Sequence, residues 1–175
     1  GMEESISGSR KDHNVRPTIN SYMYADSLAI AKIATMEGKA DIAKEYQDKA
    51  EKIKSLVEKL LWDQDTDFFE VFHPSSKPAD VREELGLIPW YFNLPQAGRG
   101  YEQAWLQILD PQGFKAPMGL MTAERRHPAF RSHGVGTCEW DGAVWPFATT
   151  QSLVGLANVL RNYKQDYVTK KDYFE

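Results

Sequence analysis

The sequence predicts an all-α protein, and three observations carry that prediction. Apolar residues recur with helical spacing over residues 18–37, 39–62 and 146–163. Pro17 and Pro146 stand at the starts of two of these segments, where a missing backbone N–H costs nothing. Gly38, between the first two segments, is a natural helix stop. We therefore expect the first two helices to form an αα-hairpin.

The composition is that of a globular domain with a real core. The 175 residues (20.0 kDa) are 42% apolar and 26% charged, with a net charge of −4. Area scaling predicts that folding buries about 70% of the chain's surface. The basic residues form no run, so nucleic acid is not an expected partner. No stretch is apolar enough for a membrane span and no signal peptide precedes the first helix, so no membrane partner is expected and the compartment stays unknown.

The first two helices differ in their expected burial. The helix over residues 18–37 is expected to be largely buried, because it is crowded with alanines and with larger apolar side chains. These larger residues include Tyr22, Met23, Leu28, Ile30 and Ile33. The helix over residues 39–62 is amphipathic. Its expected apolar face consists of Ile42, Tyr46, Ile53, Val57, Leu60 and Leu61.

Shorter elements are expected between and after the long helices. Acidic residues followed by an aromatic run over residues 63–72 predict a turn and a short strand. This run does not fit a calcium loop, because Phe68 occupies the glycine position and Pro74 the position of the bidentate glutamate. Residues 74–95 form a long connection with one helical turn at 81–85, and residues 100–109 form a short helix. A capping box at Thr169 opens a last helix.

Several reaction classes lack motif support. The sequence contains no glycine-rich phosphate loop, no Gly-x-Ser-x-Gly, no Cys-x-x-Cys and no His-Glu-x-x-His. Its histidines are scattered, and we expect loop or surface roles for them rather than metal ligation. The single cysteine, Cys138, has no His or Asn context of a nucleophile and is expected to serve in packing. No metal and no cofactor are expected.

Carboxylates beside aromatic residues are the remaining candidates for chemistry. They are Glu3 and Glu4, Glu83 and Glu84, and the segment Glu-Trp-Asp-Gly-Ala-Val-Trp-Pro at 139–146. A sugar offers hydroxyls to carboxylates and a C–H face to tryptophan. Glycoside hydrolysis needs an acid on the leaving oxygen and a second carboxylate that directs water or attacks carbon. The alternative interpretation is that these tryptophans belong to the core.

Five segments, taken together and in order, resemble the catalytic domain of bacterial mannosylglycerate-hydrolase-like glycoside hydrolases. The segments are RPTINSYMYAD at 16–26, LWD at 61–63, IPW at 88–90, TAERR at 122–126 and CEWDGAVWPFAT at 138–149. These enzymes group with trehalases and processing α-glucosidases. The resemblance implies αα-hairpins forming part of an (α/α)6 toroid, with short β-hairpin elements in loops. It implies inverting hydrolysis of an α-linked oligosaccharide.

The resemblance also implies site residues. Glu3 is the expected general acid, because Gly1-Met2-Glu3 falls where the family's acid motif lies. The implied substrate contacts are Trp90, Trp140, Asp141 and Trp145, while Arg16 and Asn20 contact the sugar or brace the acid. Arg125 contacts the sugar or makes a structural salt bridge.

The family's general base lies beyond the helix that begins at Thr169, in a segment that these 175 residues do not contain. We therefore expect residues 1–175 to be a single partial toroid domain, truncated at both ends and lacking the base. Its exposed helix faces are expected to self-associate or to bind a complementary chain. Two alternatives stay open: a non-catalytic carbohydrate-binding or assembly fragment, and an epimerase-type isomerase on the same scaffold.

Overall fold

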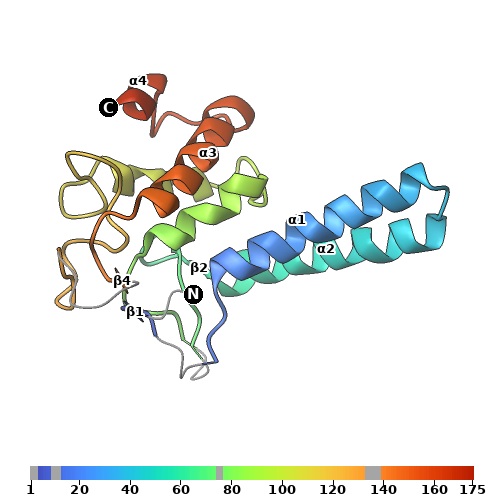
Figure 1. Cartoon of the computed structure of the whole chain (residues 1–175), viewed down its shortest axis with the longest axis horizontal. Coiled ribbons are helices and arrows are strands. Elements are labelled where there is room, and N and C mark those ends of the chain that lie inside the picture. Colours follow the sequence, from blue (N-terminus) through green and yellow to red (C-terminus); the bar gives the residue numbers. More distant parts are fainter. Residues whose placement is uncertain (1–3, 9–12, 74–76, 133–138) are drawn as a thin grey trace.

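The computed structural model describes residues 4–8, 13–73, 77–132 and 139–175, and it is mostly helical (Figure 1). The helices are α1 (Pro17–Met36), α2 (Ala40–Leu60), α3 (Pro146–Asn162) and α4 (Lys170–Phe174), with the 3₁₀ helices η1 (Glu84–Phe92) and η2 (Tyr101–Ile108). The all-α prediction is confirmed, and the three long helices begin and end within two residues of their expected positions. The predicted capping box at Thr169 is present. None of the described helices combines the length and apolar character needed to cross a membrane.

Two short strand pairs complete the described structure. Strand β2 (Trp62–Asp63) pairs antiparallel with β3 (Phe68–Phe69), which confirms the predicted turn and strand. Strand β1 (Glu4–Ser5) pairs in parallel with β4 (Glu139–Trp140). This second pair joins segments far apart in the sequence, so no local sequence signal predicts it.

Helices α1 and α2 form the expected antiparallel hairpin, which projects from the rest of the molecule (Figure 1). The expected burial of α1 is wrong. Its buried face consists of Pro17, Ser21, Tyr24, Ser27, Ala31 and Ala34. Its larger apolar side chains, Ile19, Met23, Ile30, Ile33 and Met36, are exposed. The small residues allow α2 to approach closely, and the large residues therefore lie on the other face.

The amphipathic face expected for α2 is buried only near the C-terminal end of the helix. Val57 and Leu61 are buried and Ile53 packs against the core, whereas Ile42 and Leu60 are exposed. The N-terminal half of α2 lies in the projecting part of the hairpin (Figure 1), where α1 presents mostly small residues.

The core of the body is built on η1, a segment that the sequence analysis assigned mostly to a loop. Residues 84–90 are all buried. The segment packs against both α1 and α3. Trp90 has no exposed surface, and its ring meets Phe69 and Trp105 edge-on with centroid distances of 5.4 and 5.7 Å.

Gly86 allows η1 to lie directly on the β2–β3 hairpin. A Cβ at this position would stand 2.2 Å from the Phe69 carbonyl oxygen and 2.3 Å from the Phe68 ring. Both neighbours are themselves fully buried, so neither has room to move.

We predict that Gly86→Ala destabilises the fold by about 3 kcal/mol, because the added methyl group meets backbone. The matched control is Gly38→Ala, where the Cβ meets no atom within 4 Å and the cost is the strain of a φ of +69° alone, about 1 kcal/mol. Urea unfolding of the two variants measures the difference. Equal loss in both would contradict the close approach of η1.

Candidate functional site

The parallel β1–β4 pair brings together two segments of the expected site. In its register Glu4 lies opposite Glu139, and Ser5 lies opposite Trp140. The residues that directly follow Glu3 therefore lie beside the Trp-Asp-Gly segment. Glu3 itself lies outside the described residues, as do Cys138 and His133.

Arg16 braces the turn that follows β1. Its Nη2 donates to the Gly8 carbonyl oxygen at 2.6 Å and to Ser5 Oγ at 3.2 Å, and its Nε donates to Asn14 Oδ1 at 3.0 Å. These contacts hold the turn, and the expected role of Arg16, at the sugar or as a brace for the acid, stays a prediction. Asn20 donates through Nδ2 to the Arg16 carbonyl oxygen at 2.8 Å, so it supports the same residue.

Glu83 holds the turn from the other side. The Ser7 backbone N–H donates to Glu83 Oε1 at 3.1 Å, and Ser7 Oγ donates to Glu83 Oε2. Burial of the carboxyl raises the pKa of Glu83 to about 7, while the hydrogen bonds from Ser7 and the nearby charge of Arg16 pull the pKa down. Glu83 therefore titrates near neutral pH.

The Trp-Asp-Gly segment is fixed by its own polar contacts. Asp141 is buried, and its Oδ2 pairs with the Arg131 guanidinium. The Gly142 N–H donates to Thr122 Oγ1 at 3.0 Å, and a Cβ on Gly142 would stand 2.4 Å from the Arg131 carbonyl oxygen. Asp141 Oδ2 thus holds the loop, and the expected contact of Asp141 with substrate stays a prediction.

Trp140 and Trp145 come together at this loop. Their ring centroids are 6.1 Å apart with an interplanar angle of 42°. Trp140 is mostly buried and Trp145 is partly exposed. Two residues five apart cannot share a helical face, and the extended β4 segment with its following turn is what allows these rings to approach.

A cavity of about 250 Å³ lies beside Trp140, between α1, η1 and α3. We call it the α1–η1–α3 cavity. Its lining is mainly apolar: Thr18, Tyr22, Glu84, Leu85, Ile88, Trp140, Phe147, Ala148 and Gln151. All three helices present residues from their N-terminal halves. The cavity thus adjoins the loop that carries Trp140.

Among the described residues, Glu84 is the one that brings a carboxyl group to the lining of this cavity. The residue is fully buried, and its Oε1 accepts a hydrogen bond from Ser152 Oγ at 2.9 Å. Within the described part of the chain, Glu84 Oε2, Trp140 Nε1 and Thr18 Oγ1 have no hydrogen-bond partner. Burial raises the pKa of Glu84 well above its ordinary value, which favours the protonated carboxyl.

Two expected residues do not lie at this site. Trp90 was expected to face the sugar, but it is a core residue with no exposed surface, because η1 is buried on all sides. Arg125 is exposed and its Nη2 contacts Met121 Sδ at 3.4 Å. The salt bridges of its segment are made instead by Arg82 and Arg126, both to Glu124.

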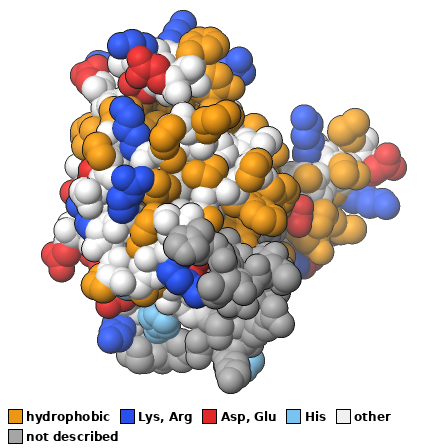
Figure 2. Space-filling view, turned by 60° about the vertical axis from the view of Figure 1, so that its left-hand side comes forward, with side chains coloured by type: hydrophobic (Ala, Val, Ile, Leu, Met, Phe, Trp, Pro, Cys, Tyr) orange, Lys and Arg blue, Asp and Glu red, His pale blue; other side chains and the backbone are white. Residues whose placement is uncertain are grey.

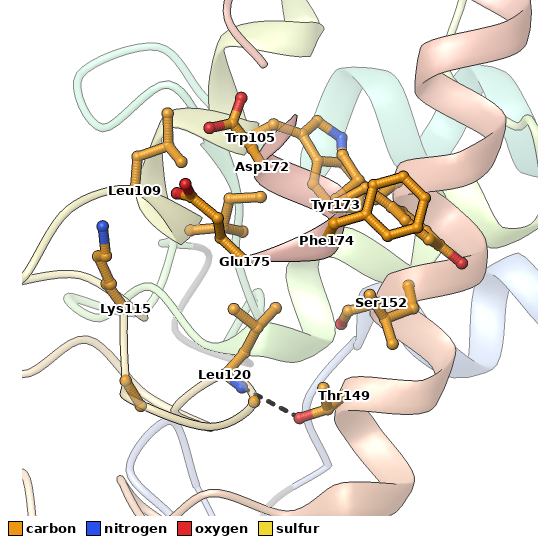
Figure 3. Close-up of a pocket in the computed structure, with 15 residues that line it drawn as sticks. Trp105, Leu109, Lys115, Leu120, Thr149, Ser152, Asp172, Tyr173, Phe174 and Glu175 are labelled. Carbon is orange, nitrogen blue, oxygen red and sulfur yellow. Dashed lines mark hydrogen bonds between the residues drawn. The ribbon is translucent and has the colours of Figure 1, made fainter. Parts of the chain in front are cut away.

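A second cavity, of about 280 Å³, lies between η2, α3 and α4 (Figure 3). Leu120 N–H donates to Thr149 Oγ1 at 3.1 Å at one side, and the C-terminal residues Asp172 and Glu175 lie at the other. Of the expected site residues that the structure describes, none lines this cavity. Among the described residues no cluster of three or more His, Cys, Asp and Glu side chains is placed to hold a metal ion.

Glu84 was one of the carboxylates considered from the sequence, but no role was assigned to it. Thr18 was not among the expected site residues. One feature of the sequence could have indicated that Glu84 is buried. Glu83 and Glu84 directly precede an unbroken apolar run that ends at Phe92. An acidic residue joined to a buried run is drawn into the interior with that run, and a buried acid is a candidate functional group.

The raised pKa of Glu83 predicts a pH-dependent stability. The folded state keeps a proton that the unfolded chain releases above its ordinary pKa of 4.5. Stability therefore falls as pH rises from 4.5 to about 7, by up to about 1.4 kcal/mol per pH unit for this group. Glu83→Gln removes this contribution, so its stability falls less steeply from pH 5 to 7 in urea unfolding. Parallel pH profiles of variant and parent would contradict the assignment.

Comparison with known proteins identifies the fold and the family. A family model for the mannosylglycerate hydrolase MGH1-like glycoside hydrolase domain matches residues 2–175. A structure named "Sialidase" is 51% identical with a TM-score of 0.95, covering 99% of this chain and 16% of that chain. A GH63 mannosylglycerate hydrolase from Thermus thermophilus, in complex with glucose, is 18% identical with a TM-score of 0.69, covering 83% of this chain and 35% of that chain.

A third similar structure is the neutral trehalase Nth1 from Saccharomyces cerevisiae, with 16% identity and a TM-score of 0.65. The match covers 83% of this chain and 28% of that chain, so the chain spans well under half the length of each of these three relatives. The two glycosidases at low identity show the fold, and the expectation of a partial all-α toroid is confirmed. The name "Sialidase" belongs to a protein of which this chain matches 16%.

Proposed function

The chain belongs to the mannosylglycerate hydrolase MGH1-like glycoside hydrolase domain family, and we propose on this basis that it forms part of a catalytic domain that hydrolyses α-linked oligosaccharides with inversion. The finer parts of this proposal, the substrate and the stereochemistry, are what the resemblance to this family implies. The two relatives at low identity are a mannosylglycerate hydrolase and a neutral trehalase.

The single observation that carries the proposal is the register of β1 with β4. Ser5 lies opposite Trp140, so the segment that directly follows Glu3 lies beside the paired tryptophans. Arg16 and Glu83 hold that segment in place from two sides. A proton donor must be positioned to within a fraction of an ångström, and this double support is what such positioning requires.

In the proposed mechanism Glu3 is the general acid. It protonates the leaving glycosidic oxygen while water attacks the anomeric carbon from the opposite face. Trp140 and Trp145 offer their rings to the C–H face of the sugar. Asp141 holds the loop that carries them, through Arg131. The general base is a second carboxylate, which inverting enzymes place about 6.5–9.5 Å from the acid.

We predict that Glu3→Gln, made in a complete catalytic domain that supplies the general base, lowers kcat/KM on α-linked disaccharides by about 10²–10⁴-fold, because an alkoxide leaves poorly without a proton. The loss on an aryl α-glycoside with an acidic phenol should be much smaller, because that group leaves without help. Glu4→Gln is the neighbouring control and keeps the parental rate. Inversion is checked by NMR, which should show that the β-anomer of the product is released first.

Full activity of Glu3→Gln on disaccharides, or initial release of the α-anomer, would contradict the proposed mechanism. A complete catalytic domain that binds sugars with no turnover on any substrate would favour the alternative, a carbohydrate-binding or assembly fragment. The two alternatives therefore separate in a single set of assays.

The exposed apolar face of α1 supports a proposal about partners. Ile30 and Ile33 are 38% and 61% exposed, and they lie on the same face as Met23. Figure 2 shows hydrophobic side chains gathered across the middle of one face of the molecule and on the projecting hairpin. A contiguous apolar surface of this kind favours association. The proposed partner is a second copy or a complementary toroid segment.

We predict that the chain sediments with a mass above its monomer value of 20.0 kDa at high concentration. Ile30→Lys combined with Ile33→Lys should weaken this association at least about tenfold, because the two changes place charge on the buried contact. Lys52→Glu, on the polar face of α2, is the control and should leave association unchanged. A monomeric parent at every concentration would contradict this proposal.

A further inference from the structure

Trp62 has no part in the proposed mechanism, although it lies in one of the segments that carry the family resemblance. It lines a cleft of about 640 Å³ between the C-terminal end of α2, the β2–β3 hairpin and the start of η2. The cleft lies where the α1–α2 hairpin joins the body (Figure 1). We call it the α2–β2–η2 cleft. None of its described lining residues belongs to the candidate site.

We propose that the α2–β2–η2 cleft binds an uncharged oligosaccharide, with Trp62 as the platform for one of its rings. The proposal goes beyond the proposed function, because it concerns residues that take no part in the mechanism. The volume of the cleft, about 640 Å³, lies within the roughly 300–1,000 Å³ of pockets that hold drug-sized ligands. A disaccharide is a ligand of that size.

Trp62 offers an aromatic ring whose orientation is fixed. The side chain is partly exposed, and its ring meets Phe69 and Tyr101 edge-on with centroid distances of 4.9 and 4.8 Å. Phe69 and Tyr101 are both buried, so the core holds the two rings against which Trp62 packs. A ring that is already held in place loses little conformational entropy when a sugar stacks on it.

The other described lining residues all carry polar groups. Glu58 and Asp67 offer hydrogen-bond acceptors, and Lys59 and Arg99 offer donors. The rest are Tyr101, two glutamines and a serine. A sugar hydroxyl both donates and accepts, so it can pair with either kind of group. No Ala, Val, Leu, Ile or Met is among the described lining residues, so the apolar side chains of a peptide find little to pack against.

The charges of the described lining balance, which favours an uncharged ligand. Two carboxylates stand against two cationic side chains. Burial raises the pKa of Tyr101 and the charge of Glu58 raises it further, while Arg99 lowers it, so both signs of charge act on one hydroxyl. An anion in the cleft would meet the carboxylates, and a cation would meet Lys59 and Arg99. A sugar without charge meets neither repulsion.

The test is titration of the ¹⁵N-labelled chain with maltose, glucose, sorbitol and sodium phosphate, followed through the indole N–H signal of Trp62. Trp62→Phe identifies that signal. We expect maltose to shift it saturably, and glucose to bind at least about threefold more weakly because it supplies one ring only. Sorbitol has hydroxyls but no ring, and phosphate is an anion, so neither should shift the signal.

Variants in the β2–β3 turn test the lining itself. Asp67→Gly removes a lining carboxylate at a φ of +52°, which glycine adopts without strain, so the fold is kept. It should weaken maltose binding at least about threefold through the lost hydrogen bond. Asp65→Gly is the matched control, because Asp65 is exposed in the same turn and is not among the described lining residues. Trp62→Ala, measured by calorimetry, should lose at least about tenfold.

The outcomes separate this inference from the proposed function. A Trp62 signal that maltose leaves in place, or that sorbitol or phosphate shifts as strongly as maltose, would overturn the inference even if disaccharides are hydrolysed. Equal maltose binding by Asp67→Gly and Asp65→Gly would overturn it as well, and this pair decides if Trp62→Ala fails to fold by circular dichroism. Binding as expected, with no turnover by a complete catalytic domain, would overturn the proposed function alone.

Discussion

The burial of η1 between α1, α3 and the β2–β3 hairpin is the constraint on which the rest of the structure depends. Trp90 joins Phe69 and Trp105 in one aromatic core, and Gly86 lets the segment lie directly on the hairpin. Because η1 is central, its first residues are carried inward with it. Glu83 and Glu84 are therefore buried acids by position, and each finds a hydroxyl partner, Ser7 and Ser152 respectively.

Glu83 and Glu84 have different structural roles. Glu83 holds the turn after β1, together with Arg16 on the other side of the turn. Glu84 lines the neighbouring cavity. The same short segment thus supports the strand that follows Glu3 and forms part of the enclosure beside Trp140. The position of the strand that follows Glu3 and the shape of the cavity beside Trp140 are coupled, because both depend on how η1 enters the core.

Local signals allowed the long helices to be predicted. Pro17, Gly38 and Pro146 mark helix ends through backbone chemistry that does not depend on the rest of the fold. Burial could not be predicted in the same way. Apolar side chains such as Ile33 indicate that a surface prefers to be covered, but the identity of the covering element is set by other segments. For α1 that element is α2, and it covers the small residues.

The candidate site was predicted in part for the same reason. The Trp-Asp-Gly loop and Arg16 were recognised from their local sequence, whereas the β1–β4 pairing that brings them together is a contact between segments far apart in the sequence. Trp90 was misplaced because an aromatic residue in a proline-containing segment fits a sugar platform and a core equally well. Composition does not distinguish these two environments, and the structure assigns Trp90 to the core.

The most direct test of the account is a crystal structure of the protein with a non-hydrolysable α-linked disaccharide. The account predicts a sugar ring beside Trp140, with the glycosidic linkage directed toward the β1–β4 pair. A disaccharide bound instead in the cavity between η2, α3 and α4, with no sugar beside Trp140, would contradict it.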